Sequence, residues 1–388
     1  MIKKVLLTIL TCLISVAVCV AQENQNDTKL LPKPVCLDGK TVYINENGRV
    51  VLKTDFDYGW SDSNSFSEGL AAFKENGKYG FIDETGKIVI KPSLDYVVAG
   101  FSEGLALIKI DSKYGFINRT GKIVVQPQYD KARNFENGLA LVAVENGRDK
   151  SDFFELIVGT IINEYTIAFN YGFIDKTGNI KVGKGKEKLK GKFDEARQFS
   201  EGLAVVRIGS KWGYVNDKDE IVIKRQFKRA ESFSEGLAPA SVDGRTWGFI
   251  DKTGKFVITP QFTRAEGFSE GLAAVSNSKS FDIWGFIDKS GNVVINYNFF
   301  SAGDFYNGTA IVRFPDTEGF GRIDRMGKAI SATRFDSASN FVNGVAWVYP
   351  RIYGENGIRY GGDYIDKTGR YIWNAKEKNE RYGKKCND

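Results

Sequence analysis

The sequence predicts an all-β protein built as an array of about eight stacked repeats, each of about 35 residues and three antiparallel strands. Two observations support this prediction. A pair of an aromatic residue and a glycine returns along the chain, with intervals of 35, 57, 41, 35, 37 and 36 residues between the glycines. Short runs of β-branched and aromatic residues lie between clusters of Gly, Asn, Asp and Pro, which is the composition of strands and turns. A fixed period of this size is typical of small units that stack on their neighbours.

One complete repeat reads WGFIDKTGKFVITPQFTRAEGFSEGLAAV, at residues 247–275. The aromatic-glycine pairs are Tyr79-Gly80, Tyr114-Gly115, Tyr171-Gly172, Trp212-Gly213, Trp247-Gly248, Trp284-Gly285 and Phe320-Gly321. A second landmark, Phe-Ser-Glu-Gly-Leu-Ala or a variant of it, places its glycine at residues 69, 104, 138, 202, 236, 271, 308 and 344. The repeat region is therefore predicted to extend over residues 40–373.

Each repeat contains three predicted strands, exemplified by residues 272–275, 247–251 and 255–258. An Asp-x-Thr-Gly turn joins the second strand to the third, because Asp can accept a nearby backbone hydrogen bond and Gly supplies a positive φ. This Asp and the Glu of the second landmark return in most repeats. We therefore expect both to build the repeat, and the Phe of the second landmark to lie in the core.

The third strand is apolar at successive positions, as in Ile88, Val89 and Ile90. Neighbouring strand residues point to opposite faces, so both faces are predicted to be covered by adjacent repeats. An open superhelical solenoid is favoured because propeller blades usually have four strands. A closed propeller-like ring is the alternative, with residues 262–268 as the source of a fourth strand.

The first 21 residues have two lysines, an apolar run and small residues before Gln22, which is the pattern of a secretory signal peptide. Cleavage is predicted after Ala21, and a lipid anchor on Cys12 or Cys19 fits less well. Residues 22–39 are predicted to be a linker, and residues 374–388 a basic polar tail. The protein is thus expected to be secreted, periplasmic or on the cell surface. No later apolar run has the length of a transmembrane span.

Composition excludes several kinds of chemistry. The chain has no histidine, which excludes Ser-His-Asp and Cys-His catalysis. Without the signal peptide the formal charge falls from +6 to +4, and the basic residues are scattered, so no nucleic-acid partner is predicted. Neither a catalytic residue nor a cofactor or metal site is predicted. Cys36 and Cys386 lie near the two ends of the mature chain and could form a disulfide, which would favour ring closure.

The order of the aromatic-Gly-Phe-Ile-Asp, Thr-Gly-Lys and Phe-Ser-Glu-Gly-Leu-Ala segments resembles the WG-repeat family, named for pairs such as Trp212-Gly213, Trp247-Gly248 and Trp284-Gly285. Repeats with Tyr or Phe in place of Trp keep a large ring before the glycine. The resemblance covers nearly all of the mature chain. It implies β-rich repeats, often in secreted or surface proteins of bacteria, with no shared reaction and no catalytic residues.

The tryptophans of these pairs have two interpretations. Trp212, Trp247 and Trp284 can pack against the next repeat. If their ring faces reach solvent, they instead form a row of platforms for sugar rings or for side chains of a partner.

Two insertions within residues 146–192 depart from the repeat and are predicted to project from one rim of the fourth full repeat. One is an apolar segment between residues 138 and 172, and the other is a lysine-rich loop at residues 181–192. Candidate interaction residues here are Phe153, Phe154, Tyr165, Lys184, Lys186, Lys188 and Lys190. They could hold an anionic or amphipathic partner. The other interpretation is a solvated loop beside a long, self-packed hairpin, and a short helix is a further alternative for the apolar segment.

These features predict an exported, non-enzymatic binding or scaffold protein of the bacterial cell envelope, which interacts with a protein or another envelope component. Binding of a carbohydrate, such as a cell-wall glycan, is the alternative. Hydrolysis by a pair of carboxylates is a third class, although no acidic residue stands out from the repeating background.

Overall fold

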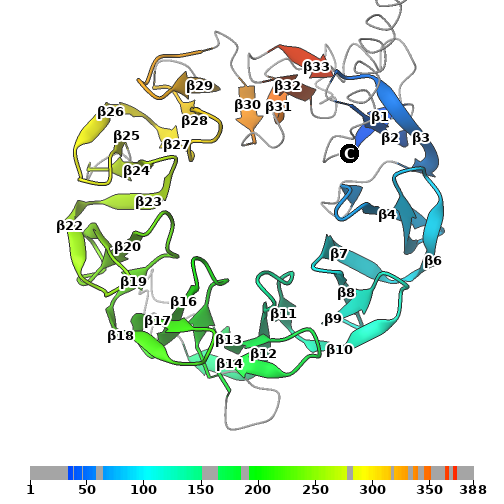
Figure 1. Ribbon diagram of the computed structural model, residues 1–388, viewed down its shortest axis with the longest axis horizontal. Helices are drawn as coiled ribbons and strands as arrows, with labels where there is room; N and C mark the ends of the chain where they lie inside the picture. Colours follow the sequence, from blue (N-terminus) through cyan, green and yellow to red (C-terminus); the bar gives the residue numbers. More distant parts are fainter. Residues whose placement is uncertain are drawn as a thin grey trace, which may run out of the picture.

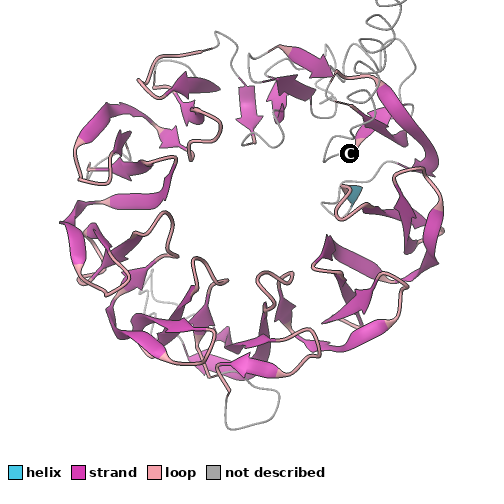
Figure 2. Ribbon diagram, viewed as in Figure 1, coloured by secondary structure: helices cyan, strands magenta, loops and turns pink. Residues whose placement is uncertain are grey.

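A computed structural model describes residues 34–37, 39–45, 47–57, 64–150, 165–184, 192–277, 283–315, 319–330, 335–339, 345–350, 363–366 and 370–373. These residues form the nine blades of a β-propeller, arranged in a ring around one axis (Figure 1), and the strands belong to eight hydrogen-bonded sheets because the last two blades share one sheet. Strands make up nearly all of the regular structure of the described chain (Figure 2).

The blades follow one another in chain order. Blade one holds β1 (Val35–Leu37), β2 (Lys40–Ile44) and β3 (Val50–Asp57), and blade two holds β4 (Leu70–Glu75), β5 (Lys78–Asp83) and β6 (Ile88–Leu94). Blade three holds β7 (Tyr96–Ser102), β8 (Leu105–Ile110), β9 (Lys113–Asn118) and β10 (Ile123–Tyr129); blade four holds β11 (Lys131–Ala132), β12 (Ala140–Lys150), β13 (Tyr165–Ile174) and β14 (Ile180–Val182). Blade five holds β15 (Glu195–Ala196), β16 (Leu203–Ile208), β17 (Lys211–Asn216) and β18 (Ile221–Phe227); blade six holds β19 (Arg229–Ala230), β20 (Ala238–Ser241), β21 (Trp247–Ile250) and β22 (Phe256–Phe262).

Blade seven holds β23 (Arg264–Ser269), β24 (Leu272–Ser276), β25 (Trp284–Ile287) and β26 (Val293–Phe299). Blades eight and nine hold β27 (Ser301–Ala302), β28 (Thr309–Arg313), β29 (Phe320–Asp324), β30 (Phe335–Ala338), β31 (Val345–Pro350), β32 (Asp363–Asp366) and β33 (Tyr371–Trp373). These last seven strands form one hydrogen-bonded sheet, in which the pair Phe320 and Phe335 joins β29 to β30.

The prediction of three strands per repeat is wrong for the five blades from blade three to blade seven, which have four. The additional strand is the innermost one and comes from the segment before the Glu-Gly turn. In blade seven this strand is β23, which pairs with β24 through Ala265 and Val275. Residues 262–268, suggested as the source of a fourth strand, do contribute to it. Each blade is antiparallel from its inner to its outer strand.

The prediction of an open solenoid is wrong, and the alternative of a closed ring fits. Figure 1 shows blade nine beside blade one. Val42 and Ile44 of blade one share a buried apolar cluster with Val345, Tyr364 and Trp373 of blade nine. Closure is favourable because an open array would leave the apolar faces of both terminal blades in water.

The predicted start of the repeat region at residue 40 is corrected by the structure. The strand β1 falls within the segment that was predicted to be a linker, so the propeller begins before residue 40. Cys36, in β1, is disulfide-bonded. Cys386, the predicted signal peptide (1–21) and the predicted tail (374–388) lie outside the described residues. Within the described part of the chain, no helix has the length and apolar content needed to cross a bilayer.

The prediction that the third strand of each repeat is covered on both faces is also wrong. This strand is the outermost of its blade, and Val257 in β22 is 52% exposed whereas Ile258 is 3% exposed. Ile258 is covered by the next blade, where a Cβ on Gly291 would lie 3.2 Å from its Cγ2 atom. The outer strand is therefore an exposed sheet edge with one buried side chain holding the next blade. Pro260 in this strand cannot donate a hydrogen bond, which hinders pairing with another chain.

The recurring acidic residues build the fold, as expected. The Asp251 side chain accepts hydrogen bonds from the backbone N–H groups of Thr253 and Lys255 and from the Thr253 hydroxyl, and so fixes its turn. The landmark phenylalanines are buried, as predicted, at Phe101, Phe135, Phe199, Phe233 and Phe268. The Glu side chains of the second landmark reach the next blade, and Glu201, for example, accepts from the Gly236 N–H at 3.1 Å.

Candidate functional site

The ring has two sides with different connections. On one side lie the Glu-Gly turns and the Asp-x-Thr-Gly turns, which are fixed by the hydrogen bonds described above. On the other side lie the turns that lead into the strands carrying the aromatic-glycine pairs, and the chain crosses there from one blade to the next. We call this second side the connection face. Residues 243–246 form such a turn in blade six, and Thr263 lies in the connection from blade six to blade seven.

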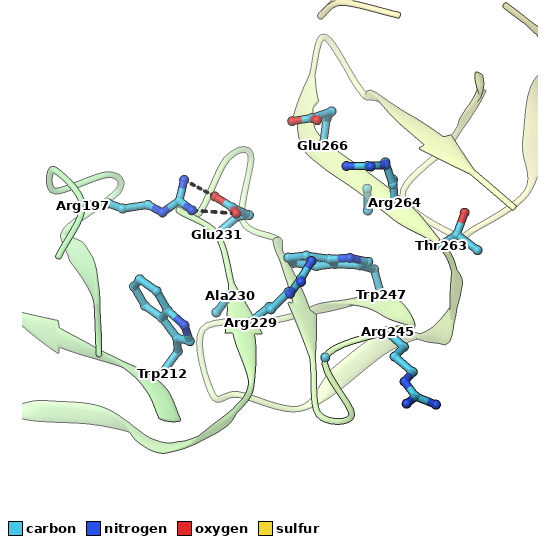
Figure 3. Close-up of a pocket in the computed structure, with 12 residues that line it drawn as sticks. Arg197, Trp212, Arg229, Ala230, Glu231, Arg245, Trp247, Thr263, Arg264 and Glu266 are labelled. Atoms are coloured by element: carbon cyan, nitrogen blue, oxygen red, sulfur yellow. Dashed lines mark hydrogen bonds and ion pairs between the residues drawn. The ribbon is translucent and has the colours of Figure 1, made fainter. Parts of the chain in front are cut away.

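A cavity of about 700 Å³ opens where blades five, six and seven meet (Figure 3). Its lining combines arginines, two tryptophan side chains, two glutamates and small residues. These are Arg197, Trp212, Arg229, Ala230, Glu231, Gly244, Arg245, Trp247, Thr263, Arg264, Ala265 and Glu266. The turn residues Gly244 and Arg245 and the connection residue Thr263 place its mouth on the connection face. Cavities of this size are typical of ligand sites.

The cavity lies where the repeat loses a recurring aspartate. In the earlier connections this aspartate anchors the neighbouring turn, since Asp95 binds Lys78 at 2.5 Å and Asp194 accepts the Gly209 N–H at 2.5 Å. The corresponding residues in the next three connections are Lys228, Thr263 and Phe300, of which Thr263 lines the cavity. The next residues along the chain are Arg229 and Arg264, where other connections have Tyr96, Lys131, Glu195 and Ser301. Two recurring aspartates are thus absent and two arginines present in successive connections, while Asp243 in the turn of blade six still supplies a carboxylate next to Arg245.

One ion pair fixes the wall between blades five and six. The Arg197 guanidinium contacts both carboxylate oxygens of Glu231, and its Nη2 atom donates to Oε1 at 2.8 Å. The same guanidinium lies 6.0 Å from the ring centre of Trp212. Burial raises the pKa of Glu231, Arg197 opposes this rise, and the nearby Glu266 adds to it. The pair therefore holds a partly desolvated carboxylate in one orientation.

Glu266 is the second acid of the cavity and has no ion pair or side-chain hydrogen bond in the described chain. Burial raises the pKa of Glu266, Asp304 raises it further, and Arg264 and Arg197 lower it. Glu231, Glu266 and Asp304 all lie near the inner edges of successive blades. Burial, together with repulsion between neighbouring carboxylates, means that Glu231 and Glu266 bind a proton more tightly than an isolated glutamate does.

Arg229 and Arg245 are exposed and take part in no ion pair or side-chain hydrogen bond within the described ranges. Figure 3 shows the Arg245 and Arg264 guanidinium groups on opposite sides of the Trp247 ring. The cavity therefore presents arginines at separate points and not as one convergent cluster.

The candidate tryptophans are buried, with exposed fractions of 8% for Trp212, 8% for Trp247 and 9% for Trp284. Trp212 and Trp247 contribute to the cavity wall, whereas Trp284 does not line it. The glycine after each ring is required by close packing, because a Cβ on Gly248 would lie 2.4 Å from the backbone oxygen of Ile258. The aromatic-glycine pair thus first serves packing between β21 and the outer strand β22, and between the equivalent strands of other blades.

The apolar insertion extends the hairpin of blade four. β12 and β13 pair from Ala140 and Ile174 out to Lys150 and Tyr165, as the interpretation of a long hairpin anticipated. Phe153, Phe154, Lys186, Lys188 and Lys190 lie outside the described residues. Tyr165 is the first residue of β13, and Lys184 is exposed. The structure does not bring these described insertion residues into the cavity.

Six charged residues of the cavity were not predicted as site residues. These are Arg197, Arg229, Glu231, Arg245, Arg264 and Glu266. Alignment of the connections within the sequence would have shown the substitution of aspartate at residues 228 and 263. The contact between three blades could not be read from that alignment, since it depends on how the blades pack.

The comparison with protein families agrees with the repeats seen in the sequence. Residues 43–79, 79–114, 114–147, 183–212, 212–245, 247–279, 284–314 and 320–349 match the family described as WG containing repeat. No curated protein matches the chain.

Solved structures show only distant similarity. BamB from Moraxella catarrhalis is 11% identical, with 82% of this chain and 93% of that chain covered and a TM-score of 0.35. Hsv2p from Kluyveromyces lactis is 9% identical, with coverages of 68% and 95% and a TM-score of 0.36. Neither similarity bears on the ligand of the cavity. The eight matching segments, in contrast, span most of the chain, and the protein belongs to the WG-repeat family.

Proposed function

We propose that this protein is an exported, non-enzymatic binding or scaffold module of the bacterial cell envelope, which holds a protein or another envelope component on its connection face. The observation that carries this proposal is the cavity between blades five, six and seven. It combines a concave shape, separate arginines and a wall fixed by the Arg197–Glu231 pair. Concave sites with a few oriented polar groups are where proteins usually bind ligands.

Preorganisation favours binding at this cavity. Trp212 and Trp247 are packed into the blades, and Glu231 is already oriented by Arg197. A partner would therefore have to order few side chains on this protein, and less of the interaction energy would be lost to conformational entropy. Arginine at such positions is also a frequent anchor of protein interfaces.

Affinity capture from the native envelope tests the proposal. The mature protein would be compared with the double variant Arg229→Glu and Arg245→Glu, and with Arg313→Glu as a control on an exposed residue of β28 outside the cavity. We expect a specific partner to be recovered with the wild type and the control and to be lost with the double variant. Equal recovery of every captured component by all three proteins would contradict the proposal.

Binding of glycan through exposed tryptophan faces is less well supported. That mode requires open ring faces, whereas the three candidate tryptophans are at most 9% exposed. Quenching of tryptophan fluorescence by cell-wall polysaccharide provides the direct test of this alternative.

Hydrolysis by a carboxylate pair is the second candidate function, and one observation favours it. Glu231 and Glu266 line the same cavity, and the pKa of each is raised, first by burial. A pair with one protonated and one ionised acid is the arrangement that glycoside hydrolysis needs. Against it, both oxygens of Glu231 are occupied by Arg197. Release of reducing sugar from envelope polysaccharide, abolished in Glu266→Gln, would establish this candidate in place of the binding role.

A further inference from the structure

We infer that the cavity between blades five, six and seven recognises two spaced carboxylates on an acidic segment of a partner protein, with Arg229 and Arg245 as the recognising residues. The inference rests on the proposed binding function and specifies the chemical class of its ligand. Three features of the cavity lead to it: free guanidinium groups, their separation, and the acids already present.

The first feature is the availability of Arg229 and Arg245. Both guanidinium groups are exposed at the cavity and have no ion-pair partner in the described part of the chain. Elsewhere on the connection face cations are paired, as the exposed Lys78 is with Asp95 and the half-buried Arg207 with Glu195. A guanidinium forms two parallel hydrogen bonds with a carboxylate, so each of the two free arginines is suited to one such group.

The second feature is the spacing of the arginines. Arg229 comes from the inner strand β19, whereas Arg245 comes from the turn between β20 and β21. Figure 3 shows the Arg229 side chain directed toward the Trp247 ring and the Arg245 side chain directed away from that ring. One small anion would therefore contact one arginine at a time. A peptide that carries several acidic side chains can place one carboxylate at each arginine.

The third feature distinguishes carboxylates from phosphate groups. Glu231 and Glu266 lie in the same cavity, and their pKa values are already raised, first by burial. A phosphate group carries about −1.5 to −2 charges near neutral pH and would be repelled by these acids more strongly than a carboxylate. Ala230 and Ala265, with the tryptophan edges, supply apolar contact for the methylene groups of Glu or Asp side chains.

Fluorescence anisotropy with defined peptides tests this inference. The probes are a fluorescein-labelled hexaglutamate with an amidated C-terminus, the corresponding hexaglutamine amide, and hexaglutamine with a free C-terminus. We expect the hexaglutamate amide to bind and the hexaglutamine amide not to bind. Binding of free hexaglutamine alone would assign the site to a single terminal carboxylate and would overturn the requirement for two.

Variants locate the binding. The double variant Arg229→Gln and Arg245→Gln is expected to weaken hexaglutamate binding by about tenfold or more, because hydrogen bonds to charged groups contribute strongly. Lysine at both positions keeps the charge but loses the paired hydrogen bonds, so an intermediate loss is expected. Arg313→Gln, with the same change in charge outside the cavity, should change the affinity by less than about twofold, as expected of a distant charge in salt. Equal binding by the wild type and the double variant, with unchanged circular dichroism, would overturn the inference.

Competition distinguishes the remaining ligand classes. Inorganic phosphate and acetate are compared at equal concentrations as competitors of hexaglutamate. Displacement by phosphate but not by acetate would identify a phosphate site and overturn the inference. The Arg229→Glu and Arg245→Glu variant could lose partner capture while hexaglutamate fails to bind the wild type. That combination would support the binding function and reject only the acidic-peptide ligand.

Discussion

The carboxylate of Glu235 in blade six accepts a hydrogen bond from the backbone N–H of Gly271 in blade seven at 2.9 Å. It also contacts the Lys289 ammonium of blade seven at 3.1 Å, and the neighbouring Ser234 hydroxyl donates to the carbonyl oxygen of Phe268. The same arrangement of Glu with the glycine N–H of the next blade recurs at Glu68, Glu103, Glu201 and Glu270. The second landmark of the sequence is therefore a connector between blades.

Replacement of Glu235 with Ala should lower the free energy of unfolding by about 1 kcal/mol, because a half-exposed ion pair and one hydrogen bond contribute modestly. Glu235→Gln keeps an acceptor for Gly271 and should lose less. Chemical denaturation of the mature protein measures both changes. Glu84→Ala, at an exposed turn position, serves as the control. Equal unfolding midpoints for Glu235→Ala and Glu84→Ala would show that the connector is unimportant.

The Glu235 connector should depend on pH. Partial burial raises the pKa of Glu235, but Lys289 and the Gly271 N–H outweigh this effect and lower it below the usual value of 4.5. The unfolded chain then binds the proton more tightly, so the stabilisation is present above pH 4.5 and is lost as the pH falls through the folded pKa. The stability difference between wild type and Glu235→Gln should accordingly shrink between pH 5 and pH 3 in denaturation curves.

Two glycine substitutions distinguish destabilisation by a steric clash from destabilisation by an unfavourable backbone conformation. A Cβ on Gly248 would lie 2.4 Å from the Ile258 backbone oxygen, so Gly248→Ala should destabilise the protein by about 3 kcal/mol or more. Gly236 has a φ of 86° but open space around it, and Gly236→Ala should cost about 1–2 kcal/mol. Thermal unfolding compares the two. Asn at residue 236 should recover part of the loss, since Asn tolerates positive φ, whereas Asn at residue 248 should not.

The outer strand offers a matched pair of neighbouring residues. Ile258→Ala removes a buried side chain that holds the next blade and should cost about 2–5 kcal/mol. Val257→Ala, at a residue 52% exposed, should remain within about 0.5 kcal/mol of the wild type. Urea denaturation of the two variants provides the measurement. Similar losses for both would mean that the outer strand is covered on both faces, as the sequence alone suggested.

The cavity acid Glu266 should destabilise the protein at neutral pH. Its pKa is raised by burial and by Asp304, so the folded state binds the proton more tightly than the unfolded chain does. Wild-type stability should therefore fall as the pH rises from about 4.5 through the folded pKa. Glu266→Gln should be the more stable protein at pH 7, and the difference should vanish near pH 4. A variant that is less stable than wild type at pH 7 would contradict the assigned direction.

The disulfide at Cys36 should contribute to ring closure. Because Cys36 lies in blade one, which packs on blade nine, reduction or Cys36→Ser should lower the free energy of unfolding by about 2–4 kcal/mol. Thermal unfolding with and without reductant measures the effect. Peptide mapping under non-reducing conditions would test the predicted bond to Cys386. A free Cys36 thiol in protein from its native compartment would contradict this role.

Much of the repeat could be predicted from the sequence because its determinants are local. The turn at Asp251 needs only the hydrogen-bonding capacity of Asp and the positive φ of Gly254. The buried Phe268 likewise follows from its fixed place before the Glu-Gly turn. The period of about 35 residues and the family therefore followed from the order of a few residue types.

Ring closure, the innermost strands and the cavity were decided only by tertiary structure. Short strands such as β19 have two residues and no sequence signal of their own, since pairing with β20 defines them. Closure depends on the buried cluster that includes both Val42 and Trp373, which are separated by most of the chain. The exposure of Val257 is set by the place of its strand at the edge of a blade, and an apolar run cannot reveal that place. The cavity likewise requires three blades to bring Arg197, Arg245 and Glu266 together, because distances between repeats are fixed by packing and not by the period of the sequence.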